Sequence, residues 1–380
     1  MNKYKLYLNA TLNEIAIDKE ALTRLFNIQM DFVPIRAIKT LDFIRKFKIS
    51  KYIYLIFGIF FFLLYPFIAF IQMIIEYMSK CKLPKNIQGF KDIALHSHHN
   101  LIPLIEKNNL AQNTIFIDIK NNNNCKQQNH LHISQILTSI DFLLAYVYSL
   151  RSLVYLFIKL ENKTDILQGY TSYKWFLVYI GLQKIEHKIN IVYFSNHYDR
   201  WSVMYDDLFK SKNLIHIQHG ILPTKLTLPY KLSNINCIYI LNKESATIYD
   251  TLFNNTHVNY IQASTSLNLT DINTDKFTIL IIGQPHCIDK EIEIINAIDK
   301  KFFIYIKPHP LHSSQKYKIL SNVYIIEDKK IFPHVNLALC YESTLGLEYQ
   351  SLCVDVLWWK DMDIKDILRE ISYRSNLHDK

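Results

Sequence analysis

The sequence predicts an α/β protein with two domains, each built on a parallel sheet, and three observations indicate this. The chain has 380 residues, which is long enough for two hydrophobic cores. Short apolar runs typical of buried strands alternate with helix-like stretches in both halves. A polar stretch at residues 271–276 separates the two sets and is the expected linker. We therefore expect an N-terminal domain over residues 1–270 and a C-terminal domain over residues 271–380.

In the N-terminal half, residues 4–8 predict a first strand and residues 18–27 a helix. Residues 136–160 are apolar with helical spacing and predict a long packed helix, whose charged residues argue against a membrane span. The other expected strands are residues 93–95, 115–119, 191–194, 214–217, 237–241 and 258–261, with a helix at residues 243–253. In the C-terminal half, strands are expected at residues 277–282, 302–306 and 336–340, and a helix at residues 289–300.

Residues 52–75 carry no charged side chain and are long enough to span a bilayer. Lysines flank this segment on both sides, so the positive-inside rule gives no orientation, and Pro66 permits a bend. We expect residues 52–78 to form a helix, or a bent helix pair, that dips into the cytoplasmic leaflet, with lysines on the headgroups. A membrane-spanning helix and a buried core helix are the alternatives.

Composition narrows the function classes. The net charge of +9 and pI of about 9.0 favour an anionic membrane or an anionic substrate. No nucleic-acid motif occurs, so we expect no nucleic-acid partner. With only 7 glycines, the chain has no glycine-rich phosphate loop. The 6 scattered cysteines predict buried thiols in a reducing compartment, and no secretory signal is expected at the amino terminus.

The strongest motif follows the expected strand at residues 302–306. Lys307, Pro308, His309 and Pro310 come next, and the two prolines prevent the strand from continuing. His309 is therefore expected on a rigid turn at the carboxyl end of a strand, with Lys307 directly before it. Both side chains add hydrogen-bond donors and positive charge to that strand end.

A second motif follows the expected strand at residues 336–340. Ser343 and Thr344 are typical helix-capping residues, and Glu348 lies one turn inside the helix they would begin. A helix amino terminus binds anions such as phosphate, and a carboxylate accepts hydrogen bonds from ribose hydroxyls. The two motifs together predict a pocket for a nucleotide whose phosphate is attached to a sugar.

The Lys307-Pro308-His309-Pro310 motif followed by Ser343-Thr344 resembles the donor-site pattern of bacterial surface-polysaccharide transferases. These include sialyltransferases and polysialyltransferases with an HP motif, capsule transferases and teichoic-acid glycerophosphotransferases. The resemblance covers about residues 190–360. It implies the GT-B architecture, in which two Rossmann-like domains flank a cleft.

In that architecture the N-terminal domain binds a glycan or glycolipid acceptor and the C-terminal domain binds the nucleotide-sugar donor. The resemblance also implies donor contacts for Gln284 and His286, which follow the first C-terminal strand. Together with the apolar segment at residues 52–78, it implies an enzyme at the cytoplasmic face of the inner membrane.

Gln218-His219-Gly220 follows the expected strand at residues 214–217 and resembles the HG motif of the same transferases. In that family the histidine is a proposed general base, which implies this role for His219. A histidine with a near-neutral pKa suits removal of a proton from a sugar hydroxyl. Asp199, after the strand at residues 191–194, is the second candidate. The alternative for His219 is a core histidine satisfied by the backbone.

A histidine-rich stretch, His96-Ser97-His98-His99, invites a metal-site interpretation. It lacks a partner motif, so a loop that lines the acceptor cleft or a solvated loop is favoured. The D-x-D at Asp361-Met362-Asp363 comes after the donor helix and is expected on the surface. We therefore expect no metal ion and no cofactor.

These features predict an inverting, metal-independent glycosyltransferase of bacterial capsule or lipopolysaccharide biosynthesis. The favoured donor is an acidic sugar linked to CMP. A UDP-sugar capsule transferase, a CDP-glycerol glycerophosphotransferase and a non-catalytic scaffold of a capsule complex are the alternatives.

Overall fold

The computed structural model describes residues 1–380 except 27, 81–90, 97–100, 111–113, 120–129, 255–256, 266, 285–286, 310–313, 322 and 379–380. The chain forms two compact units. Unit 1 comprises Met1–Gln218 and Pro223–Ala263, and unit 2 comprises His219–Leu222 and Ser264–Lys380.

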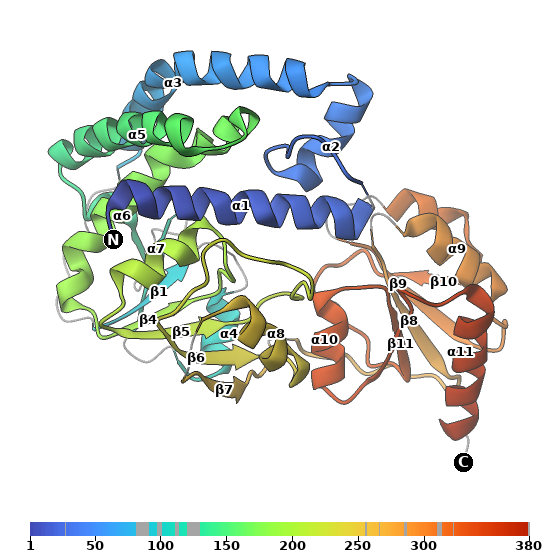
Figure 1. Ribbon diagram of the computed structural model, residues 1–380. Helices are drawn as coiled ribbons and strands as arrows, with labels where there is room; N and C mark the ends of the chain where they lie inside the picture. The colour runs from blue at the N-terminus through green and yellow to red at the C-terminus, as the bar shows by residue number, and fades with distance from the viewer. Residues whose placement is uncertain are drawn as a thin grey trace. The chain divides into compact units, whose positions relative to one another are not determined.

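Unit 1 is built on a parallel sheet of seven described strands in the order β3-β2-β1-β4-β5-β6-β7 (Figure 1). Their bounds are β1 Asp92–His96, β2 Thr114–Asp118, β3 His130–His132, β4 Ile191–Phe194, β5 Asn213–Ile217, β6 Ile235–Ile240 and β7 Asn259–Gln262. Strands β2 and β3 are added on one side of β1, and the chain then crosses to the other side of β1, where β4 pairs with it. This is the Rossmann order, with a topological switch point between β1 and β4.

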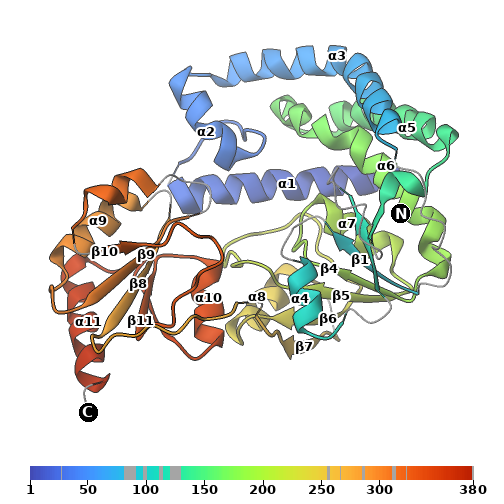
Figure 2. The same ribbon diagram turned by 180° about the vertical axis from the view of Figure 1, so that it is seen from behind.

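Three described helices of unit 1 precede the sheet in sequence: α1 Lys3–Phe26, α2 Ala37–Lys46 and α3 Lys51–Met78. The others are α4 Leu101–Lys107, α5 Ser139–Lys159, α6 Ser172–Ile185, α7 Arg200–Leu208 and α8 Glu244–Leu252, with 3₁₀ turns at Ile133–Gln135, Lys163–Thr171 and Glu186–Lys188. Figure 2 shows α3 and α5 side by side on the far side of α1 from the sheet. Two described helices, α3 and α5, are long and apolar enough to cross a membrane.

The expected strand at residues 4–8 is wrong, because these residues lie inside the continuous helix α1. Tyr7, Ala10 and Thr11 are fully buried, and this spacing marks one face of a helix. Tyr7 packs against Trp175 of α6, with ring centroids 5.0 Å apart. Helical packing over the whole length of α1 therefore outweighs the strand-like alternation of its first residues.

Unit 2 repeats the same plan with a parallel sheet of five described strands in the order β10-β9-β8-β11-β12. Their bounds are β8 Thr278–Ile282, β9 Phe303–Lys307, β10 Val323–Ile325, β11 Leu337–Cys340 and β12 Asp355–Trp358. The helices are α9 Ile288–Ala297, α10 Thr344–Ser351 and α11 Ile364–His378, with a 3₁₀ turn at Ser314–Ile319. The switch point of this sheet lies between β8 and β11.

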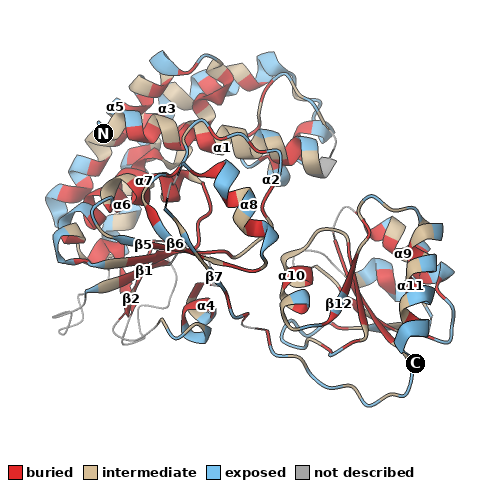
Figure 3. Cartoon of the chain, turned by 60° about the horizontal axis from the view of Figure 1, so that its bottom comes forward, coloured by how far each residue is buried: buried red, intermediate tan, exposed pale blue. Residues whose placement is uncertain are grey.

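Both faces of the second sheet are buried, as Figure 3 shows by the red colour of its central strands. In β11, Leu337 and Leu339 belong to one hydrophobic cluster, while Ala338 and Cys340 belong to another. Alternate side chains of a strand point to opposite faces, so each cluster fills one side of the sheet. The predicted α/β class, with a Rossmann-like parallel sheet in each half, is confirmed. The cleft between two domains stays a prediction.

The chain divides after Ala263, before the expected boundary at residue 270. Thr270 forms a bridge with Pro333; its amide donates to Phe332 O at 2.7 Å and its carbonyl accepts from His334 N at 2.8 Å. The polar stretch at residues 271–276 therefore follows a segment already bonded to unit 2.

Gly346 is required by the packing of α10 on β11 and β12. A Cβ atom at this position would lie 2.7 Å from Cys340 Sγ and 2.7 Å from Trp358 Cη2. Gly346→Ala is therefore expected to lower the free energy of unfolding by about 1–3 kcal/mol, because α10 has to move away from the sheet. Urea unfolding monitored by circular dichroism measures this. Gln350→Ala, at an exposed position of the same helix, is the matched control, and equal effects of the two substitutions would contradict the packing argument.

Candidate active site

The switch point of unit 2 brings together two of the predicted donor residues. Gln284 follows β8 and Ser343 follows β11, and these strands are neighbours in the sheet. Gln284 is buried, and its Nε2 donates to the carbonyl of Glu342 at 3.1 Å. The two strand ends are thus joined where α/β sheets of this topology bind ligands.

The predicted helix cap at Ser343 is confirmed. Ser343 has an extended backbone, and its Oγ accepts a hydrogen bond from Leu345 N at 3.3 Å. Thr344 is the first residue of α10. The amino terminus of this helix therefore presents backbone N–H groups, two hydroxyls and the positive end of the helix dipole beside the switch point.

Glu348 lies one turn inside α10 and is partly buried. Its Oε1 accepts a hydrogen bond from Thr265 Oγ1 at 3.3 Å. Burial raises the pKa of Glu348, and the Thr265 hydroxyl opposes that rise. The Thr265 contact fixes the direction of the carboxylate. The predicted contact of Glu348 with ribose stays a prediction.

Lys307 is the last residue of β9, and its side chain is buried. Its ammonium donates to the carbonyl oxygens of Asp328 and Ile331, at 2.5 and 2.8 Å, and lies 4.5 Å from the ring centroid of Phe332. Burial lowers the pKa of Lys307, and the charge of Asp328 opposes this. In this structure the ammonium therefore holds the loop at residues 328–332, and the predicted phosphate contact is not tested.

His309 lies two residues beyond β9 and is half-buried. Its turn is held against the end of β8 by a close approach at Gly283, whose amide donates to Lys307 O at 3.0 Å. A Cβ atom on Gly283 would lie 3.2 Å from Pro308 Cα. The turn that carries His309 is therefore packed against the loop that carries Gln284.

A buried Glu291–Tyr317 pair supports this loop and was not predicted from the sequence. Glu291, in the first turn of α9, is fully buried; its Oε1 accepts from Gln284 N at 2.8 Å and its Oε2 accepts from the Tyr317 hydroxyl. Burial raises the pKa of Glu291 to about 7. In the sequence, Glu291 is marked by its position on the apolar face of α9, between Ile288 and Ile295.

This pKa predicts a pH dependence of stability. Because the ordinary value for Glu291 is 4.5, the folded protein retains a proton that the unfolded chain releases between about pH 4.5 and 7. Protonated Glu291 therefore contributes its full stabilisation below about pH 4.5. The free energy of unfolding falls by about 3 kcal/mol as the pH rises through this window. Urea unfolding at pH 5 and pH 8 measures the loss.

Glu291→Gln is expected to remove this part of the pH dependence. Glu293→Gln, at an exposed position of the same helix, should leave it unchanged. A Glu291→Gln protein whose stability changes with pH as much as that of the parent chain would contradict the assignment.

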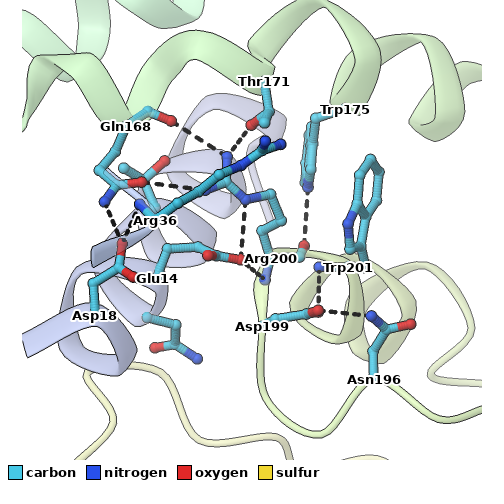
Figure 4. Close-up of polar contacts among 12 residues, drawn as sticks. Glu14, Asp18, Arg36, Gln168, Thr171, Trp175, Asn196, Asp199, Arg200 and Trp201 are labelled. Atoms are coloured by element: carbon cyan, nitrogen blue, oxygen red, sulfur yellow. Dashed lines mark hydrogen bonds and ion pairs between the residues drawn. The ribbon is translucent and has the colours of Figure 1, made fainter. Parts of the chain in front are cut away.

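In unit 1, Asp199 is the N-cap of α7 after the end of β4. Its Oδ1 accepts from Trp201 N at 2.9 Å and Ser202 N at 3.2 Å, and its Oδ2 accepts from Asn196 Nδ2 at 2.6 Å (Figure 4). Burial and the charge of Glu14 raise the pKa of Asp199 to about 6. The carboxylate has a structural role in beginning α7, and its predicted role as a second base is not tested.

Next to Asp199 lies an ion pair between buried Arg200 and partly buried Glu14 that was not predicted. Arg200 Nε is 3.0 Å from Glu14 Oε1, and Arg200 Nη1 donates to Gln168 O at 3.3 Å and to Thr171 Oγ1 (Figure 4). Burial alone would raise the pKa of Glu14, but Arg200 holds it below its ordinary value, and Glu14 raises the pKa of Arg200 against burial. The pair joins α1 to the start of α7.

His219 follows a glutamine that joins β5 to its neighbours. Gln218 Nε2 donates to Ser245 Oγ at 3.0 Å, and Gln218 Oε1 accepts from Leu241 N at 2.9 Å. His219 is half-buried, and His219–Leu222 belongs to unit 2, as the candidate donor residues do. Its predicted role as the general base stays a prediction.

The remaining predicted residues are the histidine-rich stretch, the cysteines and the D-x-D motif. His286, His98 and His99 lie outside the described residues, as do Cys81 and Cys125. Of the other cysteines, Cys287 and Cys340 are buried as expected and Cys237 is half-buried. The expectation is wrong for Cys353, which is exposed. Within the described part of the chain, no three His, Cys, Asp or Glu side chains gather as metal ligands would. Asp361 and Asp363 are exposed, as expected, and Asp363 accepts from Asp366 N at 2.8 Å.

Comparison with known proteins adds little. No protein-family model matches the sequence, and no curated protein matches it. The chain is similar to the crystal structure of Anabaena Alr3699/HepE in complex with UDP and glucose, with 9% identity and a TM-score of 0.38, over 67% of this chain and 74% of that one.

Proposed function

We propose that the protein is a glycosyltransferase that uses a nucleotide-activated sugar as its donor. One observation carries this: at the switch point of a Rossmann-order sheet, Ser343 caps α10, Gln284 lies at the adjacent strand end, and Glu348 lies one turn down the helix. A helix amino terminus at a switch point suits phosphate, and a carboxylate nearby suits ribose hydroxyls. The Lys307-Pro308-His309-Pro310 motif adds the resemblance to surface-polysaccharide transferases.

The proposed reaction is one displacement with inversion. His219 takes the proton of an acceptor hydroxyl, whose oxygen forms a bond to the anomeric carbon while the bond from that carbon to the phosphate oxygen breaks. The nucleotide leaves with the bonding electron pair. His309, the hydroxyls of Ser343 and Thr344 and the dipole of α10 stabilise the negative charge that develops on the phosphate. Lys307 adds positive charge from the strand end, and the scheme requires no metal ion.

We propose an acidic sugar linked to CMP as the donor, transferred to a glycan or glycolipid of a bacterial surface polysaccharide. The net charge of +9 is consistent with anionic substrates. A UDP-sugar donor and a CDP-glycerol donor use the same chemistry at the phosphate. They are the alternatives, together with a non-catalytic scaffold of a capsule complex.

Nucleotide release tests the proposal. The full-length protein is incubated separately with a CMP-linked acidic sugar, UDP-sugars and CDP-glycerol, with crude cell-surface glycan as acceptor, and the freed nucleotide is quantified. CMP from the CMP-sugar supports the full proposal. UDP supports glycosyl transfer with the other nucleotide, and CMP from CDP-glycerol makes the protein a phosphotransferase. No release from any donor favours the scaffold.

Glu348→Gln separates donor binding from chemistry. Loss of the charged acceptor for the ribose hydroxyls is expected to raise the KM for the donor about tenfold, equivalent to about 1.4 kcal/mol, while kcat changes little. Initial rates at varied donor concentration measure both constants, with Glu293→Gln as the control. An unchanged KM with a reduced kcat would contradict the ribose assignment.

A further inference from the structure

Helix α3 is attached to unit 1 along one stripe. Tyr54, Gly58, Tyr65 and Ala69 are its buried residues, and their spacing marks one helix face. At Gly58 the approach is close, because a Cβ atom there would lie 3.0 Å from Ile166 Cγ2. The same side of α3 therefore faces the protein through most of its length.

Polar contacts also hold α3 in this position. The Tyr65 hydroxyl accepts from Tyr173 N at 3.0 Å, and Glu76 is paired with Lys174 of α6 at 2.6 Å. Three aromatic pairs join α3 to α5: Phe62 with Phe157, Phe70 with Tyr146, and Tyr77 with Phe142, with ring centroids 4.6, 6.1 and 5.5 Å apart. Helices α3 and α5 thus form one layer, as the views from both sides show (Figures 1 and 2).

The outward side of this layer is apolar and exposed. On α3 it includes Phe60, Leu63 and Phe67, which are 58%, 61% and 69% exposed, and on α5 it includes Val154 and Ile158. Soluble monomers rarely expose a continuous apolar surface on this scale, so such a surface marks a binding site for a partner or a membrane.

The charges around this surface identify the partner. The chain from α2 to the start of α3 exposes one acidic residue, Asp42, and five basic residues: Lys39, Arg45, Lys46, Lys48 and Lys51. Arg151, on the outward side of α5, is also exposed and has a side chain long enough to reach headgroups. An apolar face next to a basic edge complements an anionic lipid surface.

The length of α3 alone does not decide how it meets the membrane. A helix of 28 residues extends about 42 Å, more than the hydrocarbon thickness of about 30 Å. Spanning, however, would remove the buried stripe and the contacts of Tyr65 and Glu76 from unit 1. Binding to one leaflet retains all of these contacts and still covers the exposed side.

We propose that the α2–α3–α5 surface binds one leaflet of an anionic bilayer without crossing it. The apolar side chains of α3 enter the interface, and the lysines and arginines of α2 contact the headgroups. This inference is independent of the donor chemistry proposed above, because it uses residues outside the candidate active site.

Vesicle sedimentation tests the surface. Full-length protein is expected to sediment with phosphatidylcholine vesicles that contain phosphatidylserine, and more weakly with vesicles of phosphatidylcholine alone. Combined Phe60→Ser, Leu63→Ser and Phe67→Ser should lower the partition coefficient at least tenfold. Ile319→Ser with Tyr324→Ser, which removes exposed apolar side chains from unit 2, is the control. Equal sedimentation of the two variants, or self-association of the parent chain without vesicle binding, would overturn the proposal.

Cysteine labelling tests the one-leaflet arrangement. Tyr52 and Met78 lie near the two ends of α3, and each is 78% exposed. Tyr52→Cys and Met78→Cys proteins, each compared with the parent chain, are bound to sealed vesicles and treated with a maleimide that does not cross membranes. Both positions should be labelled from the side on which the protein was added. Labelling of one end only after the vesicles are opened would show a spanning helix and overturn the inference.

Discussion

Replacing Arg200 with methionine is expected to lower the free energy of unfolding by about 3–5 kcal/mol. The substitution keeps an unbranched side chain but leaves Glu14, its ion-pair partner at 3.0 Å, without its counter-charge. It also removes the donors to Gln168 and Thr171, so the start of α7 loses its side-chain contacts with the turn at Lys163–Thr171 as well as the ion pair with α1. Urea unfolding at neutral pH measures the loss.

Two variants control for this result. Arg369→Met removes an exposed arginine from an ion pair with Asp366 and should cost about 0–1 kcal/mol. Adding Glu14→Gln to Arg200→Met should recover part of the lost stability, because the neutral amide of glutamine needs no counter-charge. An Arg200→Met protein as stable as the Arg369→Met protein would show that the buried pair does not hold the two helices together.

Replacing His309 with alanine is expected to lower kcat by about 10²- to 10³-fold, the usual effect of removing one group that stabilises a developing negative charge. His309 lies on the turn packed against Gly283, within unit 2. Nucleotide release under saturating donor measures the change, and circular dichroism checks the fold. His334→Ala, which removes a histidine that contacts Asp271, should retain activity. Unchanged turnover in the His309→Ala protein would refute the donor-site assignment.

Most strands could be predicted because both sheets are parallel and their central strands are buried on both faces. Strands such as β8 and β11 are therefore short and almost entirely apolar runs. The first residues of α1 were predicted as a strand, because Lys3, Tyr4, Lys5 and Leu6 alternate between charged and apolar side chains as a strand would. Only the longer spacing of its buried residues reveals the helix. Strands β3 and β10, with three residues each, give too little pattern to be recognised.

The parts of the site that could be predicted are those formed by neighbours in sequence. The cap at Ser343 depends on an amide two residues away, so its residue type was sufficient. The Glu291–Tyr317 and Glu14–Arg200 contacts join residues 26 and 186 positions apart. The neighbouring sequence does not distinguish these residues from exposed polar residues, except where one lies on the apolar face of a helix. Likewise, Lys307 could not be assigned to the carbonyls of the loop at residues 328–332, because the sequence does not show where that loop lies.

The central claim is that the switch point of unit 2 binds the nucleotide of the donor, and calorimetric titration of the full-length protein with CMP and with UDP tests it most directly. The account predicts saturable binding of one nucleotide, weakened at least tenfold by Glu348→Gln and by Ser343→Ala, and unchanged by Glu293→Gln. The absence of binding to either nucleotide, or affinity unaffected by the substitutions at Ser343 and Glu348, would contradict it.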